Sequence, residues 1–545
     1  MAEVKELTKK EFRQMQLMQL EMLIEFDRVC RKNNIRYTIF GGTLLGAVRH
    51  KGYIPWDDDA DIAMLREDYE KFVKVSDELD PKICYFQDNK NDPNYRWAYS
   101  KIRRTNTLYV RAGQEHIKCR TGFFIDVFPM DDIPKSTIGQ IINDIYVCCL
   151  RKILYAEVGK YSDSESFIKK KWYSLLSKIP KEYVYKKYEK LFSKSRNDSD
   201  NLVRCLSYPA TGKLYTKNSL KTRYGMPKKW FTELAEYDFE GVKLYGTKDY
   251  DTILKYIYND YMKLPPEDKR DPHAPVSKYS FNLKKDLVKE IKTKKNKDLL
   301  EILEKDIFQN IYLYIDAKVY GFNGENVKTY VIGNNKAILY KYYNSAQLFV
   351  KGKLNDDELT TLMDLIEENR FEMISGVEEI INNIKSRTNI YKMSKGVLMT
   401  KTKKEKTELL SKIAADKDYT SIAKLICADE NIGGHYDVSS LKNQLLERKN
   451  TKGCKNFIIK DKNELIAHAG IYADDEKFDV IGGVITNPKY RGKGYGKKVL
   501  DDTSNAIISD GKKPVLFCYD TNLIKWYESM GWKIILSCAK LERKK

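Results

Sequence analysis

The sequence predicts a multidomain protein of mixed α/β and α+β class. The chain has 545 residues and 42% apolar side chains, which is enough to bury several cores. Near each end, an apolar run passes through glycines into a helical pattern, at residues 37–49 and 480–500. The charge-dense stretch 284–305 lies between these two regions. We therefore expect an N-terminal domain, a linker and a C-terminal α/β region.

Charge limits the classes of partner. The chain carries 97 Lys and Arg against 77 Asp and Glu, a formal net charge of +20. A basic balance favours polyanions: nucleic acid, nucleotide cofactors, phosphate-bearing glycans or an anionic membrane surface. The ten cysteines include no CxxC pair, which argues against a zinc site and a disulfide framework. No stretch approaches 18 uncharged apolar residues, so we predict a cytoplasmic protein without a membrane span, able to contact the inner leaflet peripherally.

The N-terminal domain is predicted at residues 1–283. Thr8 and Glu11 have the spacing of a helix capping box, and apolar residues then recur every three or four positions to Val29, as in a core-packed helix. A strand at 37–40, a glycine turn with a helix and an acidic run at 57–61 follow. The apolar run 123–128 contains Asp126, and burying a lone carboxylate costs several kcal/mol unless something pairs with it.

The rest of the chain divides into three parts. Residues 284–305 are predicted to be a charged linker helix. Residues 306–410 have β-like runs at 311–315 and 337–340, then a helix around 359–366, without a chemical motif. Residues 411–545 alternate helices and strands around a glycine-rich loop, which is an α/β pattern.

A first group of candidate residues is suited to a cation and a phosphate. If the acidic run is a strand, Asp59 and Asp61 point to one face together with Asp57, and Asp126 on a neighbouring strand forms a third corner. Hard divalent cations take several such carboxylate oxygens. Gly41-Gly42-Thr43, at the start of a helix, lets backbone N–H groups approach a phosphate.

In this order the motifs closely resemble a known family signature. The segments 41–50 and 54–62 resemble that of the LicD family, phosphotransferases with a nucleotidyltransferase-like fold. Further similar landmarks are Asp68-Tyr69, Lys101-Ile102-Arg103, residues 125–131, Phe239-Glu240-Gly241 and residues 261–267 through His273, so the resemblance covers about residues 8–280.

The resemblance implies a metal-dependent transfer of a phospho-substituent, typically phosphocholine, from a CDP-linked donor to a cell-surface sugar. Carried over by position, Asp59 and Asp61 would hold Mg²⁺ or Mn²⁺, with Asp126 as the third carboxylate. Basic candidates for the donor phosphates are Arg49, Lys101, Arg103 and Lys269, and solvated surface charge is the alternative for each. His273 is a further candidate at the donor phosphate, with a structural role as the alternative.

A second group of residues lies in the glycine-rich loop. A basic strand-to-helix turn with exposed N–H groups suits a pyrophosphate. The run Arg491-Gly492-Lys493-Gly494-Tyr495-Gly496 resembles the RxxGxG loop of GNAT acetyltransferases, which implies binding of acetyl-CoA. If the roles known in that family apply to the matching positions here, Tyr527 would protonate the departing CoA and Asn522 would contact the cofactor. The competing interpretation of Tyr527 is a buried aromatic residue on an amphipathic helix.

The general base of the acetyl transfer is left open. Glu430, His435 and His468 lie in the right half of the chain, and each is more often a structural polar group. Residues 306–410 are interpreted as a degenerate GNAT-like half that walls the acceptor pocket. The C-terminal region is thus expected to be a GNAT-like mixed sheet flanked by helices.

The predicted whole is a bifunctional enzyme that modifies a surface glycan or its precursor, with a nucleotide-linked donor and a sugar or glycan acceptor. One alternative is a nucleotidylyltransferase that acts on a small hydroxylated molecule. Another is a basic nucleic-acid-binding protein with inactive domains, which lacks any recognisable binding motif, so no nucleic-acid partner is expected.

Overall fold

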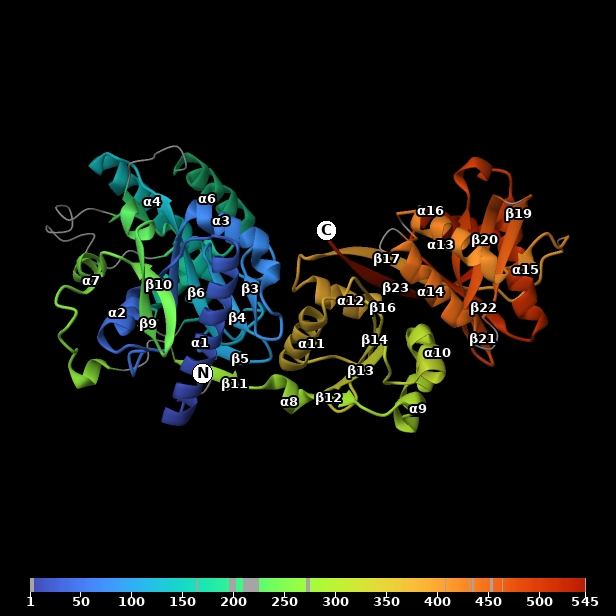
Figure 1. The fold of residues 1–545 in the computed structure, drawn as a ribbon, viewed down its shortest axis with the longest axis horizontal. Helices are drawn as coiled ribbons and strands as arrows, with labels where there is room; N and C mark the ends of the chain where they lie inside the picture. Colours follow the sequence, from blue (N-terminus) through green and yellow to red (C-terminus); the bar gives the residue numbers. More distant parts are fainter. Residues whose placement is uncertain are drawn as a thin grey trace. The chain divides into compact units, whose positions relative to one another are not determined.

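The computed structural model describes residues 4–162, 165–195, 202–208, 225–270, 275–406, 408–430, 432–433, 436–450, 454–462 and 464–544. The chain forms two compact units. Unit 1 comprises residues 1–286, 359–369 and 386–389, and unit 2 comprises residues 287–358, 370–385 and 390–545. Figure 1 follows the chain through both.

Unit 1 mixes helices with short strands. Its helices are α1 (Lys9–Lys32), α2 (Gly41–Arg49), α3 (Arg66–Val75), α4 (Thr137–Gly159), α5 (Phe167–Leu176), α6 (Lys181–Ser195) and α7 (Tyr250–Tyr258), with α8 (Leu283–Leu287) at the border with unit 2. Its strands are β1 (Thr38–Phe40), β2 (Asp61–Leu65), β3 (Cys84–Gln87), β4 (Ser100–Arg104), β5 (Leu108–Arg111), β6 (Phe124–Asp132), β7 (Leu202–Arg204), β8 (Met226–Pro227), β9 (Leu234–Phe239), β10 (Val242–Thr247) and β11 (Val276–Ser280).

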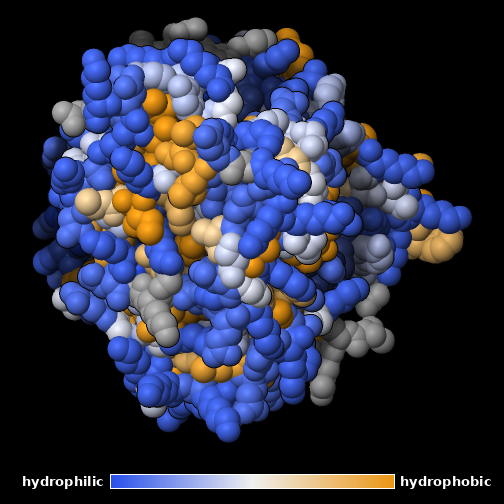
Figure 2. Space-filling view, turned by 90° about the vertical axis from the view of Figure 1, so that its right-hand side faces the viewer, coloured by the Kyte–Doolittle hydropathy of each residue, from blue (hydrophilic) through white to orange (hydrophobic). Residues whose placement is uncertain are grey.

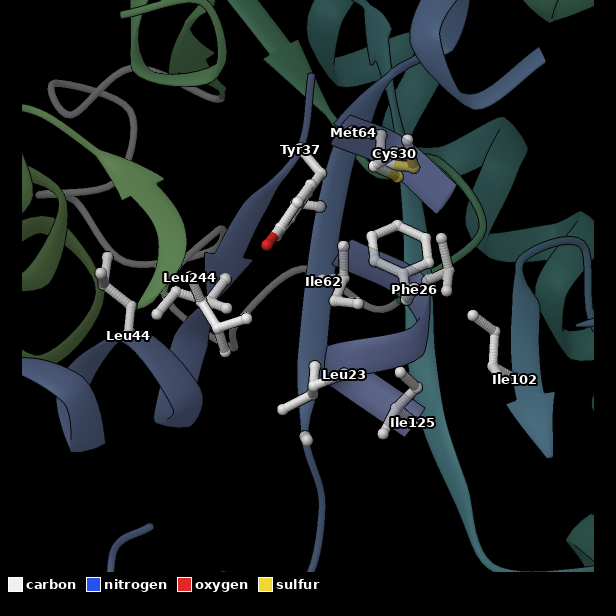
Figure 3. Packing of buried hydrophobic residues seen from close by; sticks show 14 of the residues in the cluster. Leu23, Phe26, Cys30, Tyr37, Leu44, Ile62, Met64, Ile102, Ile125 and Leu244 are labelled. Carbon is white, nitrogen blue, oxygen red and sulfur yellow. The ribbon is translucent and has the colours of Figure 1, made fainter. Parts of the chain in front are cut away.

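The central sheet of unit 1 has the order β1-β2-β6-β4-β3, with β7 and β8 extending from β6. β2 and β6 are parallel, and the other pairs along this path are antiparallel. Helix α1 packs on β4 and β6. Figure 3 shows Leu23 and Phe26 of α1 against Ile62, Ile102 and Ile125 of three neighbouring strands, and all five side chains are buried. The apolar spacing of α1 thus serves core packing, and the predicted Thr8–Glu11 capping box is present.

Unit 2 contains the remaining elements. Its helices are α9 (Lys297–Lys305), α10 (Ile311–Tyr320), α11 (Asp356–Asn369, partly assigned to unit 1), α12 (Glu378–Lys385), α13 (Tyr419–Cys427), α14 (Val438–Lys449), α15 (Tyr495–Ser509) and α16 (Thr521–Ser529). Its strands are β12 (Val288–Ile291), β13 (Val327–Ile332), β14 (Ala337–Tyr342), β15 (Ser345–Val350), β16 (Met373–Val377), β17 (Tyr391–Thr400), β18 (Lys412–Ile413), β19 (Asn456–Asp461), β20 (Glu464–Asp474), β21 (Phe478–Thr486), β22 (Lys513–Cys518) and β23 (Lys533–Arg543).

One continuous sheet runs through unit 2, in the order β12-β13-β14-β15-β16-β23-β17-β22-β21-β20-β19-β18. The last strand of the chain, β23, lies between β16 and β17 and is antiparallel to both. Strand β17 in turn pairs with β22. Residues on both sides of position 410 are therefore interleaved in one sheet, and the structure does not separate 306–410 from 411–545 as two units.

Two local predictions were wrong. Residues 311–315 form the start of helix α10, because a helix buried on most sides has an unbroken apolar run, which periodicity cannot distinguish from a buried strand. The charged stretch 284–305 is not one helix, because Val288–Ile291 form edge strand β12, paired with β13. Charged side chains suit an edge strand, whose outer side faces water.

The surface is largely hydrophilic on the face that Figure 2 shows. Figure 2 shows one face on which hydrophilic side chains dominate, with smaller apolar patches between them. Within the described residues no helix is both long enough and apolar enough to cross a membrane.

Candidate active sites

The glycine turn of unit 1 lies directly against two carboxylates. Gly41 has φ +55°, a conformation that favours glycine, and a Cβ there would lie 3.2 Å from Asp61 Oδ2. A Cβ on Gly42 would lie 2.4 Å from Asp57 Oδ2, which is too close for any side chain. Thr43 Oγ1 accepts a hydrogen bond of 2.8 Å from the backbone N–H of Asp61. The first turn of α2 and the acidic segment are therefore fitted to each other.

The acidic segment is a loop held from behind by α1. Strand β2 begins at Asp61, so Asp57–Asp59 precede the strand and the predicted strand alternation does not apply to Asp59. Buried Gln16 donates to the carbonyl oxygens of Ile54 (3.2 Å) and Asp57 (3.1 Å). Buried Gln19 donates to that of Asp58 at 2.9 Å. These bonds fix the backbone, so the carboxylates converge without a strand to align them.

Three carboxylates gather at this place, and those of Asp61 and Asp126 lie near them. Oxygens of Asp57, Asp58 and Asp59 lie within 4.8 Å of one another. Asp61 and Asp126 are register partners on parallel strands β2 and β6. Burial, followed by the charges of Asp59, Asp126 and Asp57, raises the pKa of Asp61 well above its usual value. A divalent cation offsets such repulsion, and clustered carboxylate oxygens are what Mg²⁺ and Mn²⁺ prefer, so the residues fit a metal of this kind.

Two cationic side chains face the carboxylates. Lys101 is buried and forms an ion pair with Asp126. Burial lowers the pKa of Lys101 to about 7, although Asp126 acts in the opposite direction. Arg111, at the end of β5, lies 5.0 Å from the Phe124 ring, and its buried Nε has no hydrogen-bond partner. Burial lowers the pKa of Arg111, but the charges of Asp126 and Asp58, with Tyr99 and Tyr109, raise it overall.

The other basic residues that were predicted to bind the donor phosphates either make structural hydrogen bonds or lie outside the described residues. Arg103 is buried, donating to Gln87 Oε1 (2.7 Å) and to the Gly122 carbonyl (2.9 Å), which is a structural arrangement. Arg49 donates to the Tyr261 carbonyl at 2.8 Å. The side chain of Lys269 and the whole of His273 lie outside the described residues.

The second site lies where two parallel strands of unit 2 part. β21 pairs with β22 from Phe478–Lys513 to Ile481–Leu516, and the register ends there although β21 continues to Thr486. The following turn contains Gly492 (φ +79°) and Gly494 (φ +81°), the latter being the N-cap of α15. Apart from the neighbouring residues of the chain, no described residue has an atom within 4 Å of a Cβ at either glycine. The turn is therefore an open cradle at a helix N-terminus, which fits a pyrophosphate.

Among the charged residues of this loop, Arg491 is held by two hydrogen bonds. Arg491 donates from Nη2 to Asp429 Oδ2 (3.1 Å) and from Nε to the Thr486 carbonyl (3.2 Å). Lys493 is exposed, with its ammonium 5.5 Å from the centre of the Tyr490 ring. Tyr495 begins α15 and contacts Tyr490 edge to face, and a Cβ on Gly496 would lie 2.8 Å from Thr486 Oγ1.

A cavity of about 610 Å³ lies beside the parted strands. Residues 481–484 and 516–520 line it, and so does Tyr527 of α16. Burial raises the pKa of the Tyr527 phenol far above its usual range, so that it stays protonated. Residues 308–313 and 342–348 form another part of the wall. Asn522 is exposed on the first turn of α16, outside the lining residues.

The three base candidates differ in position. Glu430 lines the cavity. His468 is fully buried between the Gly483 carbonyl (2.7 Å from Nδ1) and Asn456 Oδ1 (2.8 Å from Nε2), and burial lowers its pKa to about 4. It is outside the cavity lining, so its geometry is structural. His435 is outside the described residues.

Comparison with known proteins assigns the two regions. Residues 34–140 match the family model described as LicD/FKTN/FKRP, nucleotidyltransferase domain. The lipopolysaccharide cholinephosphotransferase LicD of Haemophilus influenzae is 30% identical over 287 residues, covering 49% of this chain and 97% of that protein. The chain belongs to the LicD family. A shorter match, 47% identical over 55 residues, joins it to an uncharacterized protein of Rickettsia typhi, over 10% of this chain and 18% of that protein.

The LicD region is followed by an acetyltransferase domain. Residues 421–532 match the model of the acetyltransferase (GNAT) family. A GNAT-family acetyltransferase from Colwellia psychrerythraea is 16% identical with a TM-score of 0.33, over 47% of this chain and 99% of that one. A tandem GNAT protein from the clavulanic acid biosynthesis pathway is 8% identical with a TM-score of 0.33, over 47% and 97%. The two family models and the LicD relative confirm the predicted LicD–GNAT combination and the enzyme class.

Sequence reasoning missed two members of the LicD site. Arg111 lies on a short β-like run outside any recognised motif, and its approach to Asp126 comes from tertiary packing. Tyr258 of α7 has its hydroxyl 3.7 Å from a Cβ position on Gly41, although about 200 residues separate them. The one available signal for Arg111 was the Tyr109–Arg111 run just before Asp126's strand.

Proposed function

We propose that this LicD-family enzyme transfers a phospho-substituent, such as phosphocholine, from a CDP-linked donor to a sugar hydroxyl. The observation that carries the proposal is the cluster of Asp57, Asp58 and Asp59 beside the Gly41–Gly42 turn, with the register partners Asp61 and Asp126 near enough to interact with it through their charges. Asp59, Asp61 and Asp126 would hold the cation, with Asp57 and Asp58 close enough to share in it. A bound Mg²⁺ or Mn²⁺ would supply charge compensation for the donor phosphates.

The protein's own groups have separate tasks in this proposal. The N–H groups at the start of α2 bind donor phosphate oxygens, and the two glycines leave room beside them for the carboxylates of Asp57 and Asp61. Arg111 adds a positive charge from β5, and Lys101 holds Asp126 in place. Transfer then breaks the bond between phosphorus and the CMP oxygen while the acceptor hydroxyl oxygen bonds to phosphorus, and CMP leaves.

For the GNAT domain we propose acetylation of an amine, on an aminosugar. Gly492 to Gly496 would bind the pyrophosphate of acetyl-CoA, and Tyr527 would give its proton to the departing thiolate. The cavity wall contains more acidic than basic side chains: Glu372, Glu430, Asp437, Asp520 and Glu542 against Lys392, Arg448 and Lys540. This balance favours a cationic amine over an anionic acceptor, and Glu430 is the base candidate that reaches the cavity.

Residues 306–410 have a supporting role in this proposal. They provide residues 308–313 and 342–348 of the cavity wall, and β15 leads into α11 without a glycine-rich loop comparable to residues 491–496. We therefore propose that this region is a degenerate GNAT-like half that shapes the acceptor pocket. An aminosugar can accept acetyl on nitrogen and the phospho-substituent on oxygen, so tethered domains would share an intermediate. If that precursor is lipid-linked, the enzyme works at the inner face of an anionic membrane.

Product analysis tests the proposal. The full chain is incubated with CDP-choline, CDP-ethanolamine or CDP-glycerol, with acetyl-CoA and with candidate aminosugars, and the products are weighed by mass spectrometry. CMP with a phospho-substituted, acetylated sugar is expected. A parallel incubation with nucleoside triphosphates tests the nucleotidylyltransferase alternative, which would release pyrophosphate there. Steeply salt-dependent RNA or DNA binding without turnover would assign the nucleic-acid alternative.

A further inference from the structure

The helices that follow the LicD site have an outward apolar face. Helix α4 packs inward through Val147, Leu150 and Leu154, which join a core with α6. Its opposite side is apolar as well, which is unusual for a surface helix. The outward residues are Ile138, Ile141, Ile142, Ile145, Tyr146 and Tyr155. Ile138 is 73% exposed and Ile142 is 62% exposed, so no described residue of unit 1 covers this face.

Helix α5 extends the same face. Phe167, Ile168, Trp172 and Leu175 are exposed, with Ile168 at 80%. The two helices adjoin through Tyr155 and Tyr173, whose rings meet at 5.5 Å. The ammonium of Lys152 on α4 lies 5.3 Å from the centre of the Trp172 ring. The two helices thus adjoin, and we call their exposed residues together the α4–α5 surface. Exposed apolar area of this kind on neighbouring helices indicates a docking site.

Charge around the α4–α5 surface identifies the occupant. Residues 135–178, which contain both helices, have eight Lys and Arg against four Asp and Glu. One of the acidic residues, Asp144, is buried and paired with Arg204, so it does not offset the exposed lysines. Lys171 lies 4.7 Å from the Phe167 ring centre, an arrangement in which the lysine stem covers apolar surface while its charge stays in water. A second copy of the chain would bring two such basic surfaces together, which like-charge repulsion opposes.

We propose that the α4–α5 surface docks the enzyme on an anionic lipid bilayer. Aliphatic side chains enter the boundary between headgroups and acyl chains, Trp172 and the tyrosines lie at headgroup depth, and the lysines meet lipid phosphates. The helices lie in the membrane plane and do not cross it, in agreement with the lack of a spanning helix among the described residues. The inference rests on the proposed membrane association of the enzyme, but not on the identity of the phospho-substituent.

Vesicle sedimentation of the full chain tests the inference. We expect binding to vesicles of phosphatidylglycerol and phosphatidylcholine in equal parts, and much weaker binding to pure phosphatidylcholine. The triple variant Ile142→Ser, Ile145→Ser, Ile168→Ser should lose at least about tenfold in partitioning, because three exposed apolar side chains no longer enter the lipid. The pair Lys171→Gln, Lys178→Gln should lose roughly fivefold per lysine.

Matched controls separate this surface from general effects. The triple variant Leu409→Ser, Ile413→Ser, Ile534→Ser removes three exposed apolar side chains from unit 2 and should bind as the wild type does. Lys297→Gln with Lys353→Gln removes two exposed charges there and should change binding little. Far-UV circular dichroism verifies that every variant is folded. Because the changed side chains are exposed, folding should be unaffected.

The outcomes are distinct from those of the transferase assay. Transfer to a soluble acceptor should be unchanged in the α4–α5 variants, so a failed transferase proposal would appear there and not in sedimentation. Equal binding by wild type and both α4–α5 variants would overturn the inference, and so would a wild type that binds neither vesicle. A third outcome is a wild type that is a dimer and binds no vesicle, with an Ile→Ser triple variant that is a monomer. This outcome would show that the α4–α5 surface contacts a second copy of the chain.

Discussion

Asp61 and Asp126 are register partners across the parallel strands β2 and β6, and Gly41 brings the backbone of α2 within contact of the first of them. Parallel pairing puts both side chains on one side of the sheet. The acidic loop adds Asp57, Asp58 and Asp59 at the same place. The LicD site is therefore built from a strand pair, a glycine turn and a loop, each set by a different part of the fold.

Arg111 is expected to contribute to donor binding through its charge. Its guanidinium faces Asp58 and Asp126 without a hydrogen-bond partner for Nε, so it is available to a phosphate. A charge-assisted hydrogen bond contributes about 1.5–3 kcal/mol, so Arg111→Ala should lower kcat/KM for a CDP-linked donor about 10- to 100-fold. Arg111→Lys should recover part of this loss. Steady-state kinetics measures the fall in kcat/KM, and thermal melting shows whether the variants are folded. An unchanged kcat/KM, or a fall that unfolding fully explains, would exclude donor binding by Arg111.

The sequence predicted the parts of this site that are close along the chain. The Gly41–Gly42 turn, the acidic run and Asp126 have local signals. Arg111 has no local signal, because it comes near Asp126 only when β5 and β6 take their positions in the folded unit. Predicting Asp59 on a strand was wrong, since buried Gln16 and Gln19 on α1 hold that segment as a loop. The placement of β23 between β16 and β17 likewise has no local signal.

Gly494 is expected to matter for the cofactor more than for the fold. An alanine at φ +81° costs about 1–2 kcal/mol of backbone strain, and its Cβ would contact no atom of the described residues beyond its chain neighbours. Gly511 has φ +78° and equally open space, outside the loop, so Gly511→Ala is a matched control for strain. Both variants should melt slightly earlier. Calorimetry should show acetyl-CoA binding weakened at least about tenfold in Gly494→Ala alone. Equal affinities in the two variants would argue against a pyrophosphate at this turn.

Tyr527→Phe should separate catalysis from binding. If the Tyr527 hydroxyl protonates the departing thiolate, kcat for acetyl transfer should fall about 100-fold, while KM for acetyl-CoA stays nearly constant. Tyr472→Phe is the control, because Tyr472 also lines the cavity and its buried hydroxyl has no hydrogen-bond partner. Acetylation rates of both variants decide the matter. A Tyr527→Phe enzyme as fast as Tyr472→Phe would leave Tyr527 as a packing residue.

His468 should make unit 2 less stable in acid. Its folded pKa of about 4 lies below the 6.5 of a free imidazole, so between these values the unfolded chain binds a proton that the folded chain does not. The associated stability is complete above pH 6.5 and is lost as pH falls toward 4, by up to about 3 kcal/mol. His468→Gln should flatten that part of the curve. Denaturant unfolding of both proteins at several pH values measures the difference, and parallel curves would contradict the assignment.

The carboxylate cluster is tested most directly by CMP release from CDP-choline in the presence of Mg²⁺. The account predicts release that requires the metal and falls at least about 100-fold in the double variant Asp59→Asn, Asp61→Asn. The double variant should remain folded, since neutral isosteres remove repulsion around Asp61. The control Asp260→Asn changes an exposed acidic residue outside the cluster and should be fully active. Unchanged turnover in the folded double variant would contradict the account.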